Sequence, residues 1–107
     1  MVILMEKIKK IRTKAFEEGS KRDAGSFFIM CIESAFSDHN FRGIEITKFD
    51  APARTVEGKS WHHTFSVRRV VIDQTKLWEV VCKRIGDSEV PAKTVLLTND
   101  TLEIYNK

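Results

Sequence analysis

Apolar residues recur at helical spacing near the start of the chain. Leu4, Ile8, Ile11 and Ala15 follow one another at intervals of four, three and four residues. This spacing places them on one face of an α-helix, and Gly19 follows as a stop signal. We therefore predict an amphipathic first helix whose apolar stripe faces the core.

A second helix is predicted immediately after Gly19. Ser20 is a suitable N-cap and Asp23 lies three residues later, as in a capping box. The run AGSFFIMCIESAF follows, and its apolar residues cover most of a helical circumference. These residues are Phe27, Phe28, Ile29, Cys31, Ile32, Ala35 and Phe36. One small sheet and one helix do not readily cover so much apolar surface, so we expect the chain to form a homodimer.

Alternation with a period of two begins at residue 43. The segment GIEITKF predicts a first strand, and a second strand contains two adjacent histidines. Its apolar row is Trp61, His63, Phe65 and Val67, and its polar row is His62, Thr64, Ser66 and Arg68. Neighbouring side chains on a strand point to opposite faces, so His62 and His63 are not expected to share one site. We expect His63 to be buried and His62 to be accessible.

Two later segments complete the predicted fold. Residues 76 to 85, KLWEVVCKRI, fit one arc of a helical wheel, but their β-branched residues leave open a further strand of a meander. The segment TVLLTNDTLEIY predicts a hairpin that turns at Asn99 and Asp100.

The pattern as a whole predicts one α+β domain over residues 1–107. Two N-terminal helices would pack on an antiparallel sheet of about four strands, with a short helix at 76–85 or, as the alternative, a fifth strand of a meander there. A chain of 107 residues is too short for two hydrophobic cores. The four apolar residues that follow Met1 are fewer than a signal peptide requires, so we expect a cytoplasmic protein.

The basic residues are concentrated in the first helix. Residues 1 to 22 carry seven Lys or Arg and three Glu, whereas the rest of the chain carries eleven basic and twelve acidic residues. Lys7, Lys10 and Lys14 flank the apolar stripe and are the candidates for contact with nucleic acid or another acidic partner. No aromatic residue alternates with them, so any nucleic-acid binding there is expected to be weak and nonspecific.

Few residues suggest catalytic chemistry. Cys31 and Cys82 lie in apolar runs and are expected to be buried free thiols. The chain has no Gly-rich phosphate loop and no zinc-ligand spacing, so no metal, cofactor or catalytic residue is assigned.

Three hypotheses of function remain. The first is a non-enzymatic binding module or oligomeric adaptor that recognises a small apolar ligand or a protein partner, with Trp61, His62 and Arg68 as ligand-binding candidates. The second is a nucleic-acid or acidic-partner binder that uses the first helix together with Arg68, Arg69, Lys83 and Arg84. The third is a small acid–base enzyme that uses His39, His62 or His63.

Overall fold

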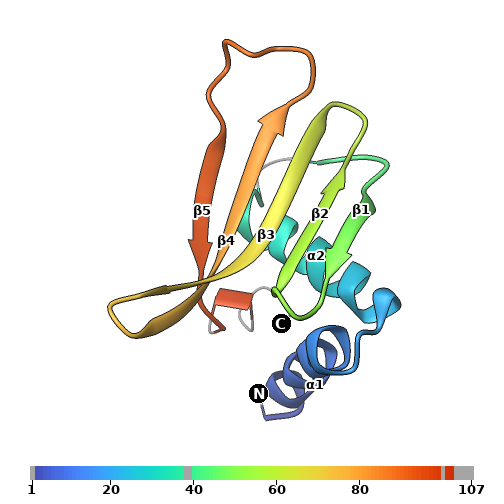
Figure 1. The fold of residues 1–107 in the computed structure, drawn as a ribbon, viewed down its shortest axis with the longest axis vertical. Helices are drawn as coiled ribbons and strands as arrows, with labels where there is room; N and C mark the ends of the chain where they lie inside the picture. The colour runs from blue at the N-terminus through green and yellow to red at the C-terminus, as the bar shows by residue number, and fades with distance from the viewer. Residues whose placement is uncertain (1, 38–39, 100, 103–107) are drawn as a thin grey trace.

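The fold combines helices with one antiparallel sheet (Figure 1). The structure, a computed structural model, describes residues 2–37, 40–99 and 101–102. The elements in chain order are helix α1 (Val2–Arg12), the π-helical turn η1 (Thr13–Glu17), helix α2 (Lys21–Ala35), and strands β1 (Glu45–Asp50), β2 (Thr55–Lys59), β3 (His63–Ile72), β4 (Thr75–Arg84) and β5 (Lys93–Leu97). The strands lie in chain order and each pairs antiparallel with the next. The α+β class predicted from the sequence is confirmed.

Residues 76 to 84 lie in strand β4, so the alternative of a fifth meander strand is confirmed and the short helix is wrong. Trp78, Val80 and Cys82 are buried on the face toward the helices, while Glu79 and Val81 lie on the other face and are half-buried. The apolar residues of this segment also fit one arc of a helical wheel, so its own pattern allows either a helix or a strand. The strand forms because β4 pairs with β3 in register from Thr75 to Arg84.

The β3–β4 hairpin extends beyond its neighbours. Pairing with β2 ends at Arg68, and pairing with β5 ends at Trp78. The rest of the hairpin, residues 70–77, therefore projects from the sheet as a two-stranded ribbon (Figure 1). We call it the projecting hairpin. Val71 on this hairpin is 62% exposed.

The tip of the projecting hairpin holds two residues in the left-handed region. Asp73 has φ of 50° and Gln74 has φ of 68°. A two-residue turn with both φ values positive matches the twist of a hairpin, but glutamine adopts it at a cost that glycine avoids.

Gln74→Gly is therefore expected to stabilise the protein by about 1 kcal/mol, after allowance for the greater freedom of glycine in the unfolded chain. Urea denaturation of the two proteins measures the difference. Gln74→Ala is the matched control and should change stability little, because alanine meets the same restriction at positive φ. Equal effects of both substitutions would show that backbone strain at Gln74 is unimportant.

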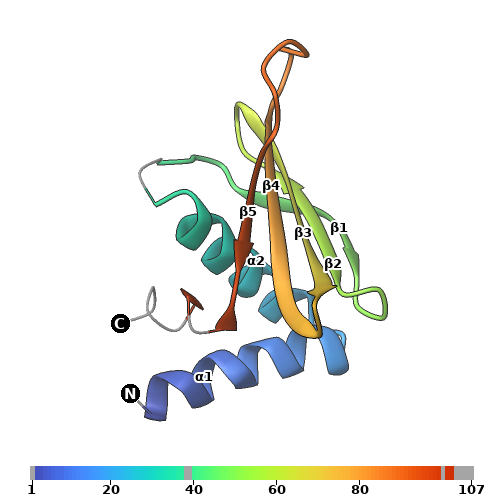
Figure 2. The ribbon, with the colours of Figure 1, turned by 90° about the vertical axis from the view of Figure 1, so that its left-hand side faces the viewer.

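The core lies between the sheet and helix α2. Figure 2 shows both helices on the same side of the sheet. Ser20 caps α2 as predicted, since its Oγ accepts a hydrogen bond from the Asp23 N–H at 3.3 Å. The side chains of Phe27, Phe28, Cys31 and Ile32 are fully buried. They pack against the inward row of the sheet, which includes Val56, Phe65, Val67, Val80 and Cys82.

The first helix ends in a π-helical turn that the sequence did not indicate. Ile8 and Ala15 are buried and Ile11 is half-buried, which confirms those positions of the predicted stripe. After Arg12 the helix widens, and the Glu18 N–H donates to the Thr13 carbonyl at 3.2 Å. This turn also buries Phe16 against the sheet.

The predicted C-terminal hairpin is wrong at the residues that the structure describes. Asn99, Thr101 and Leu102 form a helical turn where the return strand was expected. Thr98 starts this turn, because its Oγ1 accepts from the Thr101 N–H at 3.1 Å and its carbonyl accepts from the Leu102 N–H at 3.3 Å. Asp100 and residues 103–107, which the hairpin prediction also included, lie outside the described residues.

Helix α2 is largely covered within one chain. Of the seven apolar residues predicted to surround it, only Ile29 is exposed, at 39%. The excess apolar surface that suggested a homodimer is therefore small, and the homodimer stays a prediction without that support. Within the described part of the chain, no helix has both the length and the apolar character needed to cross a membrane.

Candidate functional site

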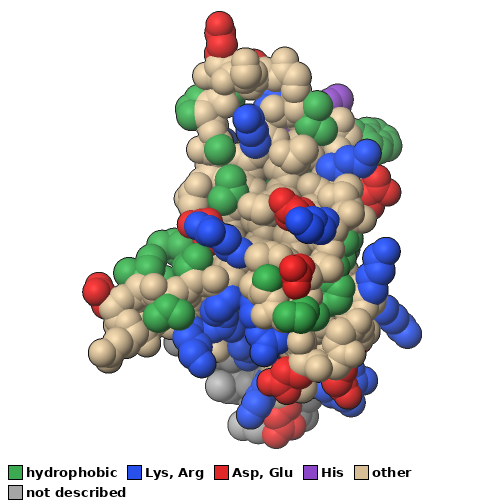
Figure 3. Space-filling model, in the orientation of Figure 1, with side chains coloured by type: hydrophobic (Ala, Val, Ile, Leu, Met, Phe, Trp, Pro, Cys, Tyr) green, Lys and Arg blue, Asp and Glu red, His purple; other side chains and the backbone are tan. Residues whose placement is uncertain are grey.

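A cleft of about 550 Å³ lies between the projecting hairpin and the end of the first helix. The projecting hairpin contributes Val71 and Lys76 to this cleft, and the first helix contributes Lys9 and Arg12. The cleft lining includes one acidic residue, Glu17, and five basic ones: Lys9, Arg12, Arg54, Arg69 and Lys76. Basic side chains gather next to the base of the projecting hairpin (Figure 3). We call this site the arginine cleft.

The floor of the arginine cleft is aromatic. The rings of Phe16 and Trp78 stack with centroids 5.1 Å apart and an interplanar angle of 22°. Phe27 packs edge-on against Trp78 at 4.7 Å. Trp78 is only 1% exposed, so the cleft floor is also part of the hydrophobic core.

Two arginines lie on this floor. Arg69 follows Phe65 and Val67 on the inward row of β3 and is directly opposite Trp78 on β4. Its guanidinium carbon lies 4.1 Å from the centroid of the Trp78 ring. The guanidinium of Arg54 lies 5.6 Å from the centroid of Phe16. Both arrangements are cation–π contacts, which hold a flexible side chain in place.

The backbone brings Arg54 and Arg69 together. The Arg69 N–H donates a hydrogen bond to the Arg54 carbonyl at 3.1 Å. Arg54 lies in the β1–β2 turn with φ of 57°, a conformation that costs an arginine more than a glycine. A residue that keeps a costly conformation beside a cleft is a candidate for function.

The third arginine comes from the last position of α1. Arg12 donates from Nη1 to the Oδ1 of Asn99 at 2.7 Å, which joins the helix to the segment after β5. Lys9, one helical turn earlier, and Lys76, on the projecting hairpin, are exposed and complete the basic lining.

The positive charges in the cleft repel one another. Burial lowers the pKa of Arg69, and the positive charges of Arg12 and Arg54 lower it further. Among the described residues, no carboxylate forms an ion pair with Arg54 or Arg69. The adjacent Arg68 differs, since its Nε lies 2.7 Å from Glu79 Oε1. The like charges of Arg54 and Arg69, which have no ion-paired carboxylate among the described residues, repel each other and disfavour folding, and an anionic ligand would relieve this repulsion.

The predicted ligand-binding residues do not form one site. Trp61 and His62 line a smaller cleft of about 290 Å³, at the end of the sheet where β3 begins. Arg68 instead lies on the outer sheet face, and its hydrogen bond to Glu79 raises its pKa. The structure thus brings Trp61 and His62 together but separates them from Arg68.

Trp61 is 67% exposed, so its predicted place in the buried row is wrong. The ladder of β3 begins only at His63, and the Ser60 N–H closes a turn by donating to the His63 carbonyl at 2.8 Å. Trp61 lies inside that turn and is free of the strand alternation. Phe65 and Val67 are buried as predicted, whereas His63, which was also expected to be buried, is only half-buried.

The three histidines differ in what the structure shows of their environments. His62 is exposed, as expected. His63 is half-buried, and its ring centroid lies 5.1 Å from that of Phe41 and 6.2 Å from that of Phe65. His39 lies outside the described residues. Among the described residues, no three His, Cys, Asp or Glu side chains gather as a metal site would require.

The lysines proposed for nucleic-acid contact do not line the arginine cleft. Lys7 is exposed, while Lys10 and Lys14 line a shallow depression together with three glutamates. These are Glu6, Glu17 and Glu18. The glutamates offset the basic charge that the sequence assigned to this helix face.

Both cysteines are buried and unpaired, as predicted. Burial raises the pKa of the Cys31 thiol and of the Cys82 thiol. Neither thiol is therefore poised as a nucleophile near neutral pH.

The sequence interpretation missed three central residues of the cleft, Phe16, Arg54 and Trp78, and it named Arg69 only as one cation of the acidic-partner hypothesis. One signal was present, because continuing the row of Phe65 and Val67 by two residues places Arg69 on the buried face. A charged residue at an inward position is uncommon unless it has a partner or a function.

Comparison with models of protein families, with curated proteins and with solved structures gives no match to this chain.

Proposed function

We propose that this protein is a binding module for a small ligand that carries two or more negative charges, held in the arginine cleft. The observation that carries the proposal is the pair Arg54 and Arg69, fixed on aromatic rings and without a carboxylate partner among the described residues. The sequence favoured an apolar ligand, but the lining of this cleft favours an anionic one.

The chemistry of the guanidinium group supports phosphate or carboxylate as the bound group. A guanidinium on an aromatic face keeps the N–H groups at its edge available, and these match two oxygens of one phosphate or carboxylate. The cleft volume, about 550 Å³, lies within the range usual for small-molecule sites. Arg12, Lys9 and Lys76 supply further positive charge to a ligand with more than one anionic group.

The proposal is tested by calorimetry with pyrophosphate and with citrate. The cleft variant Lys9→Gln, Arg54→Gln, Arg69→Gln is expected to bind the better of these ligands at least about 100-fold more weakly, because two charge-assisted contacts are lost. The matched control is Lys7→Gln, Lys10→Gln, Lys14→Gln, which removes the same number of charges from residues of the first helix that do not line the cleft. The control is expected to bind within about threefold of the unaltered protein, since long-range screening weakens the effect of distant charges.

Thermal melting provides a second measurement. A ligand that binds only the folded protein raises the melting temperature, and at about 100 times its dissociation constant it adds about 2.7 kcal/mol of stability. The cleft variant should lose this increase and the control should keep it. Equal losses in both variants would mean that net charge, not the cleft, attracts the anion, and would overturn the proposal.

A further inference from the structure

The indole of Trp61 is exposed but held in place. Trp61 donates its backbone N–H to the Arg42 carbonyl at 3.0 Å. Gly43 has φ of 69°, and a Cβ at this position would collide with the indole nitrogen, so the ring rests directly against the Gly43 backbone. One part of the ring is thus packed against the chain while 67% of the residue stays open to solvent. A rigid, exposed aromatic ring loses little freedom when a ligand stacks on it.

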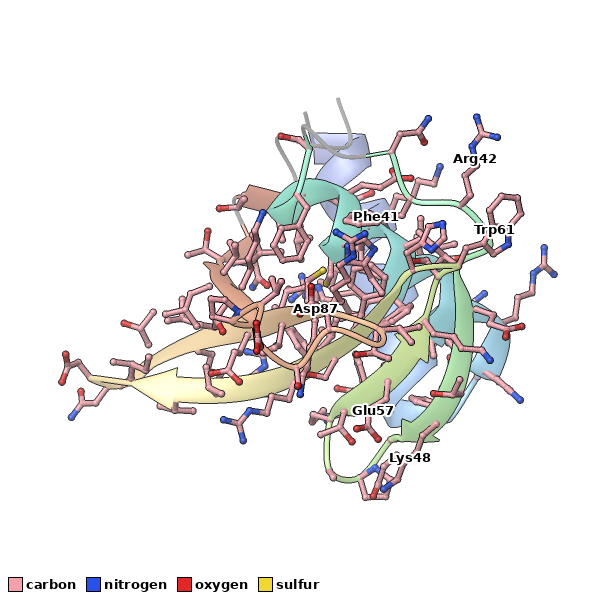
Figure 4. The ribbon with its side chains drawn as sticks, turned by 90° about the horizontal axis from the view of Figure 1, so that it is seen from above. Phe41, Arg42, Lys48, Glu57, Trp61 and Asp87 are labelled. Carbon is pink, nitrogen blue, oxygen red and sulfur yellow. The ribbon has the colours of Figure 1, made fainter. Side chains whose placement is uncertain are left out.

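Basic side chains surround this ring. Arg42 and His62 line the same small cleft as Trp61. Figure 4 shows Arg42 and Trp61 beside each other, both directed away from the body of the molecule, whereas Phe41 lies further in. The end of β4 adjoins this turn, since the Ile85 N–H donates to the His62 carbonyl at 2.9 Å.

One more cation comes from the end of β4. Arg84 is exposed and lies opposite His63, which lines the same small cleft, whereas Lys83 lies opposite Thr64 on the other face of the sheet. Within residues 2–37, 40–99 and 101–102, no carboxylate forms an ion pair with Arg42 or Arg84. By contrast, the nearby Lys59 is paired with Glu45 at 3.7 Å.

We propose that Trp61, Arg42, His62 and Arg84 form a second binding surface whose ligand is single-stranded nucleic acid. A base stacks on the open face of Trp61, and the flanking phosphates contact Arg42 and Arg84. An aromatic platform among unpaired cations is the arrangement that such ligands require. A duplex fits poorly, because its bases are stacked inside the double helix and cannot reach the ring. The sequence suggested Arg84 only as an addition to the first helix, whereas this surface includes no residue of that helix and does not depend on the arginine cleft.

The number of cations sets the expected salt dependence. Two phosphate contacts to a single strand correspond to a slope of about −1.4 in a plot of log K against log salt concentration. Binding should therefore be moderate and should weaken at high salt.

The test uses a labelled oligothymidylate of about twelve nucleotides and fluorescence anisotropy at low salt. Trp61→Ala is expected to weaken binding roughly 10- to 100-fold, the range usual for loss of one stacked base, while Trp61→Phe keeps most of the affinity. Because Trp78 is buried, the unaltered protein should also lose part of its tryptophan emission on binding, through Trp61. The double variant Arg54→Gln, Arg69→Gln should bind the oligonucleotide normally, which separates this surface from the arginine cleft.

Four results would overturn the proposal. They are absence of binding, equal affinity for a duplex of the same length, full competition by polyglutamate at equal charge, and unchanged affinity in Trp61→Ala. Competition by polyglutamate would identify an acidic protein segment as the better partner. A thermal melt of Trp61→Ala, expected to match that of the unaltered protein closely, ensures that lost binding is not caused by unfolding.

Discussion

Trp78→Ala is expected to lower the free energy of unfolding by about 4 kcal/mol, as large truncations of buried aromatic residues do. The side chain is 1% exposed and contacts Phe16, Phe27 and Arg69. Its removal leaves a cavity between the sheet and the first helix and takes away the platform under Arg69. Urea denaturation followed by circular dichroism measures the loss.

The chain contains its own matched control, because its other tryptophan is exposed. Trp61→Ala, at a residue that is 67% exposed, should change stability by less than about 1 kcal/mol. Similar losses in the two variants would contradict the assignment of Trp78 to the core and Trp61 to the surface. Circular dichroism before denaturation shows whether each variant is folded at the start.

A third tryptophan variant separates packing from hydrogen bonding. The Nε1 of Trp78 is buried and has no hydrogen-bond partner among the described residues. Trp78→Phe keeps an aromatic ring on the cleft floor and removes this unsatisfied donor. We therefore expect it to cost much less than Trp78→Ala.

The α+β class was predictable because it depends mainly on local patterns. The stripe that includes Ile8 and Ala15, the cap at Ser20 and the alternation of Phe65 and Val67 are all local, and the structure confirms them. Strand β4 was ambiguous for the same reason, because the apolar residues of KLWEVVCKRI fit both the period of a helix and the period of a strand. Pairing with β3 is a contact that periodicity within the segment does not reveal.

The arginine cleft was not predictable in the same way. Its cations come from four segments that meet only in the folded chain: α1, the β1–β2 turn, β3 and β4. Trp61 illustrates a different difficulty. The predicted strand began at Trp61, two residues before β3 begins at His63. The residues of a turn between strands have no periodic pattern, so the sequence did not show where the turn ends.

Two residues of the cleft, Arg54 and Arg69, depart from the local conformational and burial preferences of arginine. Arg54 has positive φ, and Arg69 takes a place on the inward row that an apolar side chain would fill more favourably. Each choice disfavours folding, and both serve to bring positive charge over the aromatic floor. Such conflicts between local preference and global structure are expected at binding sites, where they are kept for function.

The second large effect is expected at Gly58, in the middle of β2. A Cβ at this buried position would overlap the backbone carbonyl oxygen of Glu45 and would lie 2.6 Å from Cε2 of Phe28. The carbonyl belongs to the neighbouring strand and the ring is fixed in the core, so neither can move without disturbing the β1–β2 pairing. Gly58→Ala should therefore cost about 3 kcal/mol, although alanine is otherwise the better strand residue.

Gly25 provides the matched control for this prediction, because the same substitution there should have the opposite sign. Gly25 lies inside helix α2, and a Cβ would meet Cδ1 of Ile46 at 3.7 Å, an ordinary contact. Gly25→Ala should therefore stabilise the protein by about 0.5 to 1 kcal/mol through its higher helix propensity. Chemical denaturation of both variants tests the pair. If Gly58→Ala is as stable as the unaltered protein, the close approach of helix α2 to strands β1 and β2 is incorrect, because the sheet would then leave room for the added methyl group.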